Sequence, residues 1–315
     1  MDDFDRPKRA LTYLEPAALQ ELKNLRFAAK RIVEGSFAGR HRSKMRGSSV
    51  EFADYREYTP GDDLRRLDWK VYMRSRRPYI RTYDEETNMS CLLALDISAS
   101  MAFGGNAAIK STQGRGAGLS KLDYCRYLAA GLAYLIVENR DEAGLALLGQ
   151  RLSDYCAPRS TRTHLDELLN RLERASVSPG THLGAGLQTL FTLCRRRGVL
   201  VLISDFLDSD LDAVFQAVRL FRHRRFEIIF FHIVHPEELI LPEGRAIRFY
   251  DPEGPHEVEV NPQDVERDYF TRFEAHRQRV RNMAIGNGCE YQLIETRTPY
   301  PDAIRAYLRA REAAS

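Results

Sequence analysis

The stretch CLLALDISASM, residues 91–101, decides the fold, because five apolar residues run directly into an aspartate and two serines. A short apolar run that ends in a polar turn is typical of a strand buried on both faces at the centre of a sheet. Asp96, Ser98 and Ser100 occupy alternate positions, so a tight turn can direct all three side chains inward. The stretch therefore predicts a central strand with an oxygen-rich loop at its carboxyl end.

Beyond this strand, short apolar runs alternate with helical stretches. Further strands are predicted at residues 143–148, 199–203, 227–234 and 290–294. Helices are predicted near residues 122–138, 165–173, 183–195 and 211–221, and after a hairpin over 246–260 a long polar helix covers 262–283. Alternation of this kind with apolar strands predicts an α/β fold with a doubly wound, mostly parallel sheet that helices cover on both faces.

The first part of the chain follows another pattern. Apolar residues near helical spacing predict a helix over residues 16–33, and the Gly-, Ser- and Arg-rich residues 35–49 predict an irregular loop. We therefore expect a smaller N-terminal region of helix, strand and irregular chain over residues 1–88. The α/β domain is expected over residues 89–315, with the hairpin and the long helix inserted near 240–288.

Composition excludes several classes of function. The chain has 47 Lys and Arg against 44 Asp and Glu, a net charge of +3, which is too balanced for a surface built for nucleic acid. Basic and aromatic residues do alternate over residues 40–81, but acidic residues among them favour ion pairs, with Trp69 packing as an anchor. Apolar runs are strand-sized, so we expect no membrane span and a cytoplasmic protein. Five cysteines without a CxxC pair indicate reduced, buried thiols.

Two further loops supply oxygen atoms. Thr181 lies in a loop before a predicted helix, and Asp205 follows the predicted strand 199–203. Because loops at the carboxyl ends of parallel strands meet at one edge of the sheet, the following side chains can converge: Asp96, Ser98, Ser100, Thr181 and Asp205. Such a set suits Mg²⁺, or alternatively Mn²⁺ or Ca²⁺, and a vacant coordination position would accept one acidic ligand from outside. The alternative is that these side chains only cap the segments that follow them.

In this order the five residues resemble the metal-ion-dependent adhesion site, or MIDAS, of the von Willebrand factor A fold. The wider chain resembles the MoxR-associated family known as domain of unknown function number fifty-eight. Its signature is similar to Glu51-Phe52, Arg56-x-Tyr58-x-Pro60-Gly61-Asp62-Asp63, Arg65 and Asp68-Trp69. This resemblance covers most of the chain from Gly35 onward. Two features depart from it: Phe206 stands where such domains often have glycine, and the Gly-rich stretch 103–120 is long for a simple loop.

The resemblance implies a metal-dependent protein–protein interaction module. Its expected partners are a MoxR-type AAA+ ATPase and a client protein that bears an acidic residue. The chain would then be an adaptor or chaperone cofactor in protein remodelling, assembly or metal insertion.

A metal-dependent phosphohydrolase is the alternative function. Such enzymes use two carboxylates in a DxD pattern, whereas Ser98 replaces the second aspartate here, and the three loops contain no Lys and no His except His182. We therefore expect that the chain is not an enzyme.

Overall fold

The computed structural model describes residues 13, 14, 16–22, 25, 27, 51–59, 67–84, 89–104, 119–208, 210–241, 247–252 and 256–313. They fall into two compact units. The main unit combines residues 1–30 with residues 89–315, and the small unit comprises residues 31–88.

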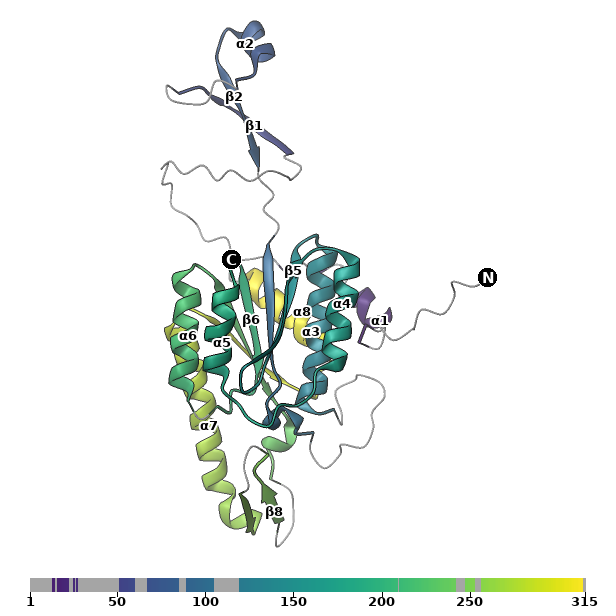
Figure 1. Cartoon of the computed structure of the whole chain (residues 1–315), viewed down its shortest axis with the longest axis vertical. Helices are drawn as coiled ribbons and strands as arrows, with labels where there is room; N and C mark the ends of the chain where they lie inside the picture. Colours follow the sequence, from purple (N-terminus) through teal and green to yellow (C-terminus); the bar gives the residue numbers. More distant parts are fainter. Residues whose placement is uncertain are drawn as a thin grey trace, which may run out of the picture. The chain divides into compact units, whose positions relative to one another are not determined.

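The main unit is built on a central sheet (Figure 1). This sheet has six strands in the order β10-β7-β6-β3-β4-β5. The strands are β3 (Ser90–Asp96), β4 (Glu142–Leu148), β5 (Leu152–Arg159), β6 (Val199–Ser204), β7 (Glu227–Val234) and β10 (Glu290–Glu295). Every neighbouring pair is parallel except β4 and β5. This is the doubly wound order, in which the chain first builds outward on one side of β3 and then on the other. The predicted fold class is confirmed.

Strand β5 was not predicted from the sequence. It is an antiparallel edge strand that follows β4 after a tight turn, in which the Gly149 amide donates to the Arg151 carbonyl at 3.0 Å. Its residues are mostly half-buried or exposed, because an edge strand needs to bury only part of its surface. It therefore lacks the continuous apolar run that marks β3 and β6.

Helices cover both faces of the sheet (Figure 1). One face carries α3 (Lys121–Glu138), α4 (Arg162–Arg174), α8 (Tyr300–Ala313) and α1 (Pro16–Leu22). The other carries α5 (Leu183–Leu193), α6 (Leu211–His223) and the last turns of α7 (Pro262–Gly286). Successive residues of β3 point to opposite faces, so Leu93 joins the first core and Leu92 the second. Both faces of the central strand are thus buried, as its apolar run predicts.

The N-terminal helix belongs to the main unit, which corrects the predicted boundary of a 1–88 region. The Tyr13 ring contacts Tyr127 edge to face at 5.1 Å, and Arg305 on α8 binds Glu21 at 2.6 Å. The apolar face of α1 is too small to be stable alone and is buried by this packing. The helix ends at Leu22, earlier than predicted, and the loop predicted over 35–49 lies outside the described residues.

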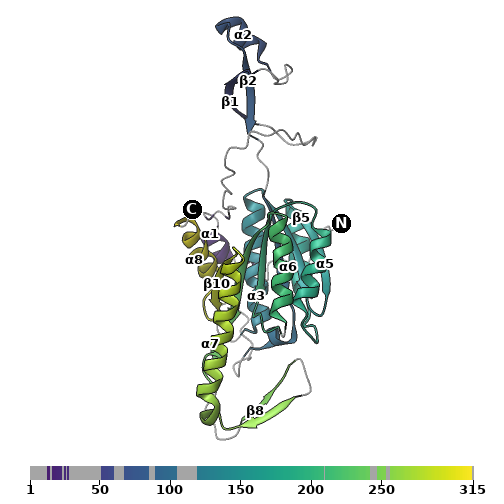
Figure 2. The ribbon, with the colours of Figure 1, turned by 90° about the vertical axis from the view of Figure 1, so that its left-hand side faces the viewer.

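A short helical turn, a hairpin and a long helix follow β7. They are η4 (Pro236–Glu238), β8 (Ile247–Tyr250), β9 (Glu257–Val260) and α7. Within α7, Val280 and Ala284 near its end pack into the core, whereas the first half of the helix and the hairpin extend beyond the body of the unit (Figure 2). The predicted hairpin and long polar helix are therefore present.

The small unit contains an antiparallel pair, β1 (Glu51–Glu57) and β2 (Tyr79–Asp84), and the short helix α2 (Trp69–Ser75). Asp68 caps α2 by accepting from the Lys70 amide at 2.9 Å and the Val71 amide at 3.3 Å. Trp69 is 60% exposed and Met73 is 82% exposed. The prediction that Trp69 packs as an anchor is therefore wrong for the small unit, since more than half of this side chain is exposed.

In the part of the chain that the structure describes, no helix combines the length and apolar character needed to cross a membrane.

Candidate metal centre

The loop after β3 folds back on itself through hydrogen bonds. Asp96 ends the strand, and its Oδ1 accepts from the Ser98 amide at 2.8 Å. The 3-10 helix η3 (Ala99–Ala102) then places the Ser100 hydroxyl 3.0 Å from that of Ser98. The other oxygen of Asp96, Oδ2, accepts from the Ser204 hydroxyl of β6 at 2.6 Å. Four oxygen-bearing side chains from two adjacent strand ends are therefore in contact, and all are buried.

Asp205 joins this cluster from the end of β6. Its Oδ1 accepts from the Leu207 amide at 3.1 Å, and a hydrogen bond from Ser100 connects it to the loop after β3. Strands β3 and β6 are the neighbours at which the winding direction of the sheet reverses, and ligands of doubly wound folds bind at this point. The structure thus brings together four of the five predicted ligands.

Thr181, the fifth predicted ligand, reaches the same edge of the sheet on the loop before α5. The Ser178 amide of this loop donates to the Ile97 carbonyl at 2.6 Å, and the His182 amide donates to the Gly149 carbonyl at 3.2 Å. These bonds tie the loop to the ends of β3 and β4. Thr181 is buried, and its hydroxyl stays a predicted ligand.

A lysine that sequence reasoning missed lies within the cluster. Lys121 begins α3, and its Nζ donates to Asp205 Oδ2 at 2.6 Å and to Glu238 Oε1 at 2.5 Å. Its side chain has an exposed fraction of 0%. The position of Lys121 at the start of a predicted helix could have indicated this pairing. The helix dipole disfavours a cation in the first turn, so a nearby carboxylate is expected to stabilise it.

Glu238 links the site to the extended helix α7. Its Oε2 accepts from the His235 amide at 2.7 Å, and its own carbonyl accepts from the Tyr269 hydroxyl at 3.0 Å. Tyr269 lies in the first half of α7. A chain of contacts therefore runs from Asp205 through Lys121 and Glu238 to the long helix.

The pKa shifts in the cluster arise from burial and from the neighbouring charges. Burial and the nearby charge of Asp205 raise the pKa of Asp96 to about 7, although hydrogen bonds from Ser204 and Ser98 oppose the shift. Burial would also raise the pKa of Asp205, but the Lys121 ammonium outweighs it and holds that pKa below its ordinary value. For Lys121, burial favours a lower pKa, and the two carboxylates outweigh it and raise the pKa. Lys121 is therefore a permanent cation that neutralises only part of the cluster.

The donor set suits a divalent cation. With Asp96, Asp205 and Glu238 ionised, three carboxylates and one ammonium leave a net charge of −2 in the buried cluster. The groups of the loops after β3 and β6 are carboxylate and hydroxyl oxygens, which hard cations such as Mg²⁺ prefer. A divalent ion beside Asp96 would balance this charge and relieve the repulsion between Asp96 and Asp205.

Phe206, which follows Asp205, adopts a backbone conformation that favours glycine. Its φ of 53° lies in the left-handed region, which explains why a glycine is often found here in similar domains. Its buried ring packs against Phe230 at 5.1 Å, and its carbonyl lies 3.1 Å from His276 Nε2. Ring packing thus offsets backbone strain of the order of 1–3 kcal/mol at the candidate site.

The order of the sheet and the position of the cluster define a doubly wound α/β protein with an acidic, oxygen-lined site at its switch point. Residues 54–280 match the family model described as protein of unknown function DUF58, and the chain belongs to this family. Its curated relatives include the uncharacterized proteins Mb1516 of Mycobacterium bovis and Rv1480 of Mycobacterium tuberculosis. Each is 27% identical over 301 residues, which cover 94% of this chain and 87% of the relative.

Solved structures with a similar fold include the conserved hypothetical protein BatB from Bacteroides thetaiotaomicron. It is 14% identical, with 72% of this chain and 100% of that chain covered and a TM-score of 0.45. The VWA domain of SpRpn10 is 11% identical, with 70% of this chain and 95% of that chain covered and a TM-score of 0.39.

Proposed function

We propose that the chain is a metal-dependent protein–protein interaction module. In this proposal Asp96, Ser98, Ser100, Thr181 and Asp205 hold one Mg²⁺, with Mn²⁺ or Ca²⁺ as alternatives. An aspartate or glutamate of a partner protein completes the coordination of the ion. The observation that carries the proposal is the buried pair of carboxylates, Asp96 and Asp205, in which burial and then the charge of Asp205 raise the pKa of Asp96.

A cation held in this way would favour an acidic ligand. The two negative charges of Asp96 and Asp205 together equal the positive charge of a divalent ion. The occupied site therefore has no strong excess of negative charge that would repel a third carboxylate. Five protein ligands leave one position of an octahedral Mg²⁺ site for water, and a partner carboxylate can replace that water. Affinity for the partner then depends on the metal, since the metal itself is part of the interface.

The proposed partner is a MoxR-type AAA+ ATPase, and the proposed role is that of an adaptor in protein remodelling, assembly or metal insertion. This part of the proposal rests on the family resemblance of the signature residues. A client protein with an exposed acidic residue would be the second partner. The cytoplasm, where ATP is available, is the proposed place of the interaction.

A binding role is favoured over a catalytic one. Ser98 stands two residues after Asp96, where a phosphohydrolase of the DxD type has its second carboxylate, and its hydroxyl contacts Ser100. Lys121 is paired with two carboxylates that raise its pKa. It therefore stays protonated and does not supply the neutral amine that a general base requires. Turnover of phosphate esters that Asp96→Asn abolishes would support the enzyme instead.

The test measures binding of the full chain to a MoxR-type ATPase of the same organism by calorimetry, with Mg²⁺ and with EDTA. We expect EDTA and Asp96→Ala each to weaken binding by at least about tenfold, as loss of a metal ligand does. Asp212→Ala is the matched control, because this aspartate is exposed on α6 and pairs with Arg279 at the surface. Binding that is equally tight in EDTA would contradict the proposal.

A direct metal titration separates the site from the partner. Titration of the isolated chain with Mg²⁺ should give saturable binding that Ser98→Ala weakens and Asp212→Ala leaves unchanged. If Ser98→Ala binds the metal as tightly as the wild type, the predicted set of ligands is wrong. Normal metal binding without ATPase binding would instead refute only the partner.

A further inference from the structure

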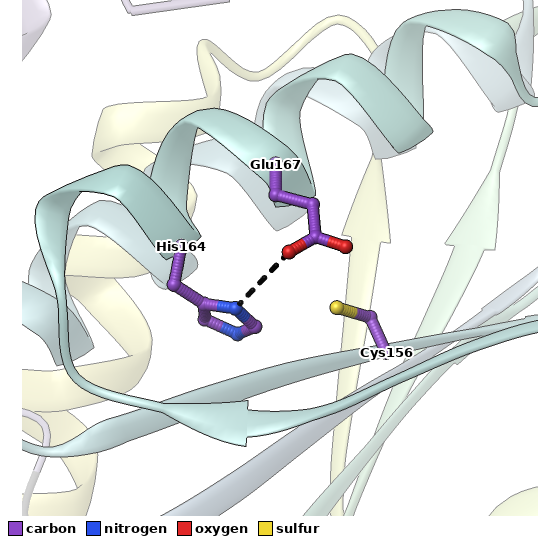
Figure 3. A group of neighbouring side chains, drawn as sticks. All are labelled: Cys156, His164 and Glu167. Carbon is purple, nitrogen blue, oxygen red and sulfur yellow. Dashed lines mark ion pairs between the residues drawn. The ribbon is translucent and has the colours of Figure 1, made fainter.

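A second group of candidate ligands lies away from the Asp96 cluster, between the edge strand β5 and the helix that covers it. Cys156 comes from β5, and His164 and Glu167 come from the first turns of α4 (Figure 3). One ligand atom from each side chain lies within 4.8 Å of the other two. Cys156 and His164 are buried and Glu167 is half-exposed, so the group combines an internal side with an opening to solvent.

The imidazole of His164 is oriented as in a metal ligand. Its Nε2 lies 2.9 Å from the carbonyl of Ala143 on β4, and because a carbonyl can only accept, Nε2 carries the hydrogen. In the neutral ring Nδ1 then holds a lone pair. Metal-binding histidines characteristically donate their other N–H to a backbone carbonyl or carboxylate in this way.

This Nδ1 atom is buried and makes no hydrogen bond within the described residues. Its nearest acidic atom, Glu167 Oε2, is 3.7 Å away, too far for a hydrogen bond (Figure 3). A buried acceptor without a partner costs about 1–3 kcal/mol, so such an atom in a folded protein requires an explanation. A cation placed between Nδ1, Oε2 and the sulfur would supply the missing partner.

Glu167 is held in position by an arginine. Its Oε1 accepts from Arg171 Nη2 at 2.8 Å and from Nε at 3.2 Å, which leaves Oε2 turned toward His164. Arg171 also binds Asp154 at 2.5 Å, so its charge is matched by a second carboxylate. Hydrogen bonding to Arg171 lowers the pKa of Glu167, and the group is therefore an ionised acceptor near neutral pH.

We propose that Cys156, His164 and Glu167 bind Zn²⁺. One sulfur, one nitrogen and one oxygen ligand suit this borderline ion better than Mg²⁺, which prefers oxygen. Zinc bond lengths of about 2.0–2.3 Å place tetrahedral ligand atoms roughly 3.3–3.8 Å apart, so the side chains need to close by only about 1 Å. The fourth position is taken by water.

Binding is balanced in charge and open to solvent. Burial raises the pKa of the Cys156 thiol, so the thiol is protonated before the ion binds, and binding releases this proton to solvent to form the thiolate. Thiolate and Glu167 carboxylate then match the two charges of the ion. Glu167 and Arg171 line a groove, so the Glu167 side of the group faces solvent. The ion would join the edge strand β5 to α4, independently of the oxygen-lined site.

Cobalt tests the proposal, because Co²⁺ replaces Zn²⁺ and absorbs in the near ultraviolet when a thiolate binds it. The metal-free full chain is titrated with Co²⁺ and then with Zn²⁺. We expect a charge-transfer band that saturates near one equivalent and disappears as Zn²⁺ displaces Co²⁺. Cys156→Ser should abolish the band, and Glu167→Gln should weaken Co²⁺ affinity by at least about tenfold.

Two controls separate this site from other thiols and from the oxygen-lined site. Cys194→Ser alters a buried cysteine of the opposite core, and Asp96→Ala alters the other candidate centre, so both should keep the band. Glu167 is half-exposed, and its replacement should leave the fold intact, as circular dichroism can verify. The proposal is overturned if the wild type gives no band, if the band survives in Cys156→Ser, or if Glu167→Gln binds Co²⁺ with wild-type affinity.

Discussion

Replacement of Lys121 by methionine tests whether this lysine neutralises the Asp96 cluster. The ammonium contacts Asp205 at 2.6 Å and Glu238 at 2.5 Å, and the lysine side chain is fully buried. Methionine keeps most of the volume but leaves the two carboxylates without their cation. Removing one partner of a buried ion pair costs about 3–5 kcal/mol. Lys121→Met should therefore lower the free energy of unfolding by that amount when no divalent cation is present.

The assay is urea unfolding in EDTA, followed by circular dichroism, near neutral pH. Because the pKa of Lys121 is raised, its contribution is fully present below the ordinary lysine pKa of about 10.4 and is lost only as pH rises above it. Arg248→Met is the control, since the Arg248–Glu259 pair is exposed and should contribute no more than about 1 kcal/mol.

Mg²⁺ adds a second, independent readout. Loss of the ammonium frees Asp205 for the metal, so Mg²⁺ should stabilise Lys121→Met more than it stabilises the wild type. A loss below about 1 kcal/mol in EDTA would refute the idea that the lysine neutralises the cluster. Equal stabilisation of both proteins by Mg²⁺ would show that lysine and metal do not share Asp205.

Three further substitutions test the site and its surroundings. Folding raises the pKa of Asp96 from 3.8 to about 7, so stability of the metal-free wild type should fall as pH rises through this interval, whereas Asp96→Asn should show a weaker pH dependence in thermal unfolding. Phe206→Gly should lose about 1–3 kcal/mol in urea unfolding, because the lost ring outweighs the relief of strain. Gly184→Ala should cost about 1–3 kcal/mol by the same measurement, since the new Cβ would lie 2.8 Å from Ala213 on α6.

Each of these has a matched comparison. Wild type and Asp96→Asn with the same pH dependence in EDTA would contradict the assigned shift. Phe206→Ala loses the ring but keeps the strain, so it should be about 1 kcal/mol less stable than Phe206→Gly, and the reverse order would disprove strain at this residue. Gly286→Ala is the control for Gly184, because its Cβ would meet nothing within 4 Å.

The central sheet could be predicted because a strand that is buried on both faces has a continuous run of apolar residues. Strands β3 and β6 are apolar over most of their length. Asp96 ends β3 and Asp205 follows β6, and in the observed strand order these two strand ends are adjacent. The edge strand β5 was missed because its half-buried residues do not form an apolar run. The pattern of apolar residues thus predicts a strand that is buried on both faces more readily than a strand at the edge of the sheet.

The electrostatic partners of the site could not be predicted in the same way. Lys121 pairs with Asp205 and Glu238, which are 84 and 117 residues away, and the pairing depends on how α3 and η4 meet the sheet. The group of Cys156, His164 and Glu167 likewise exists only because α4 covers β5, the strand that was not predicted. Contacts between elements require the packed structure, whereas contacts within one loop after a strand do not.

The hydrogen bond from Tyr269 to the Glu238 carbonyl connects the long helix α7 to a residue that takes part in the charge balance of the site. A ligand that shifts the first half of α7 would strain this bond to Glu238, whose carboxylate shares Lys121 with Asp205. If that ligand changes the cation affinity of the Asp96 cluster, thermodynamic reciprocity requires that a cation bound there change the affinity of α7 for the ligand by the same factor. Binding of a ligand to the first half of α7 would then depend on whether the cation site is occupied.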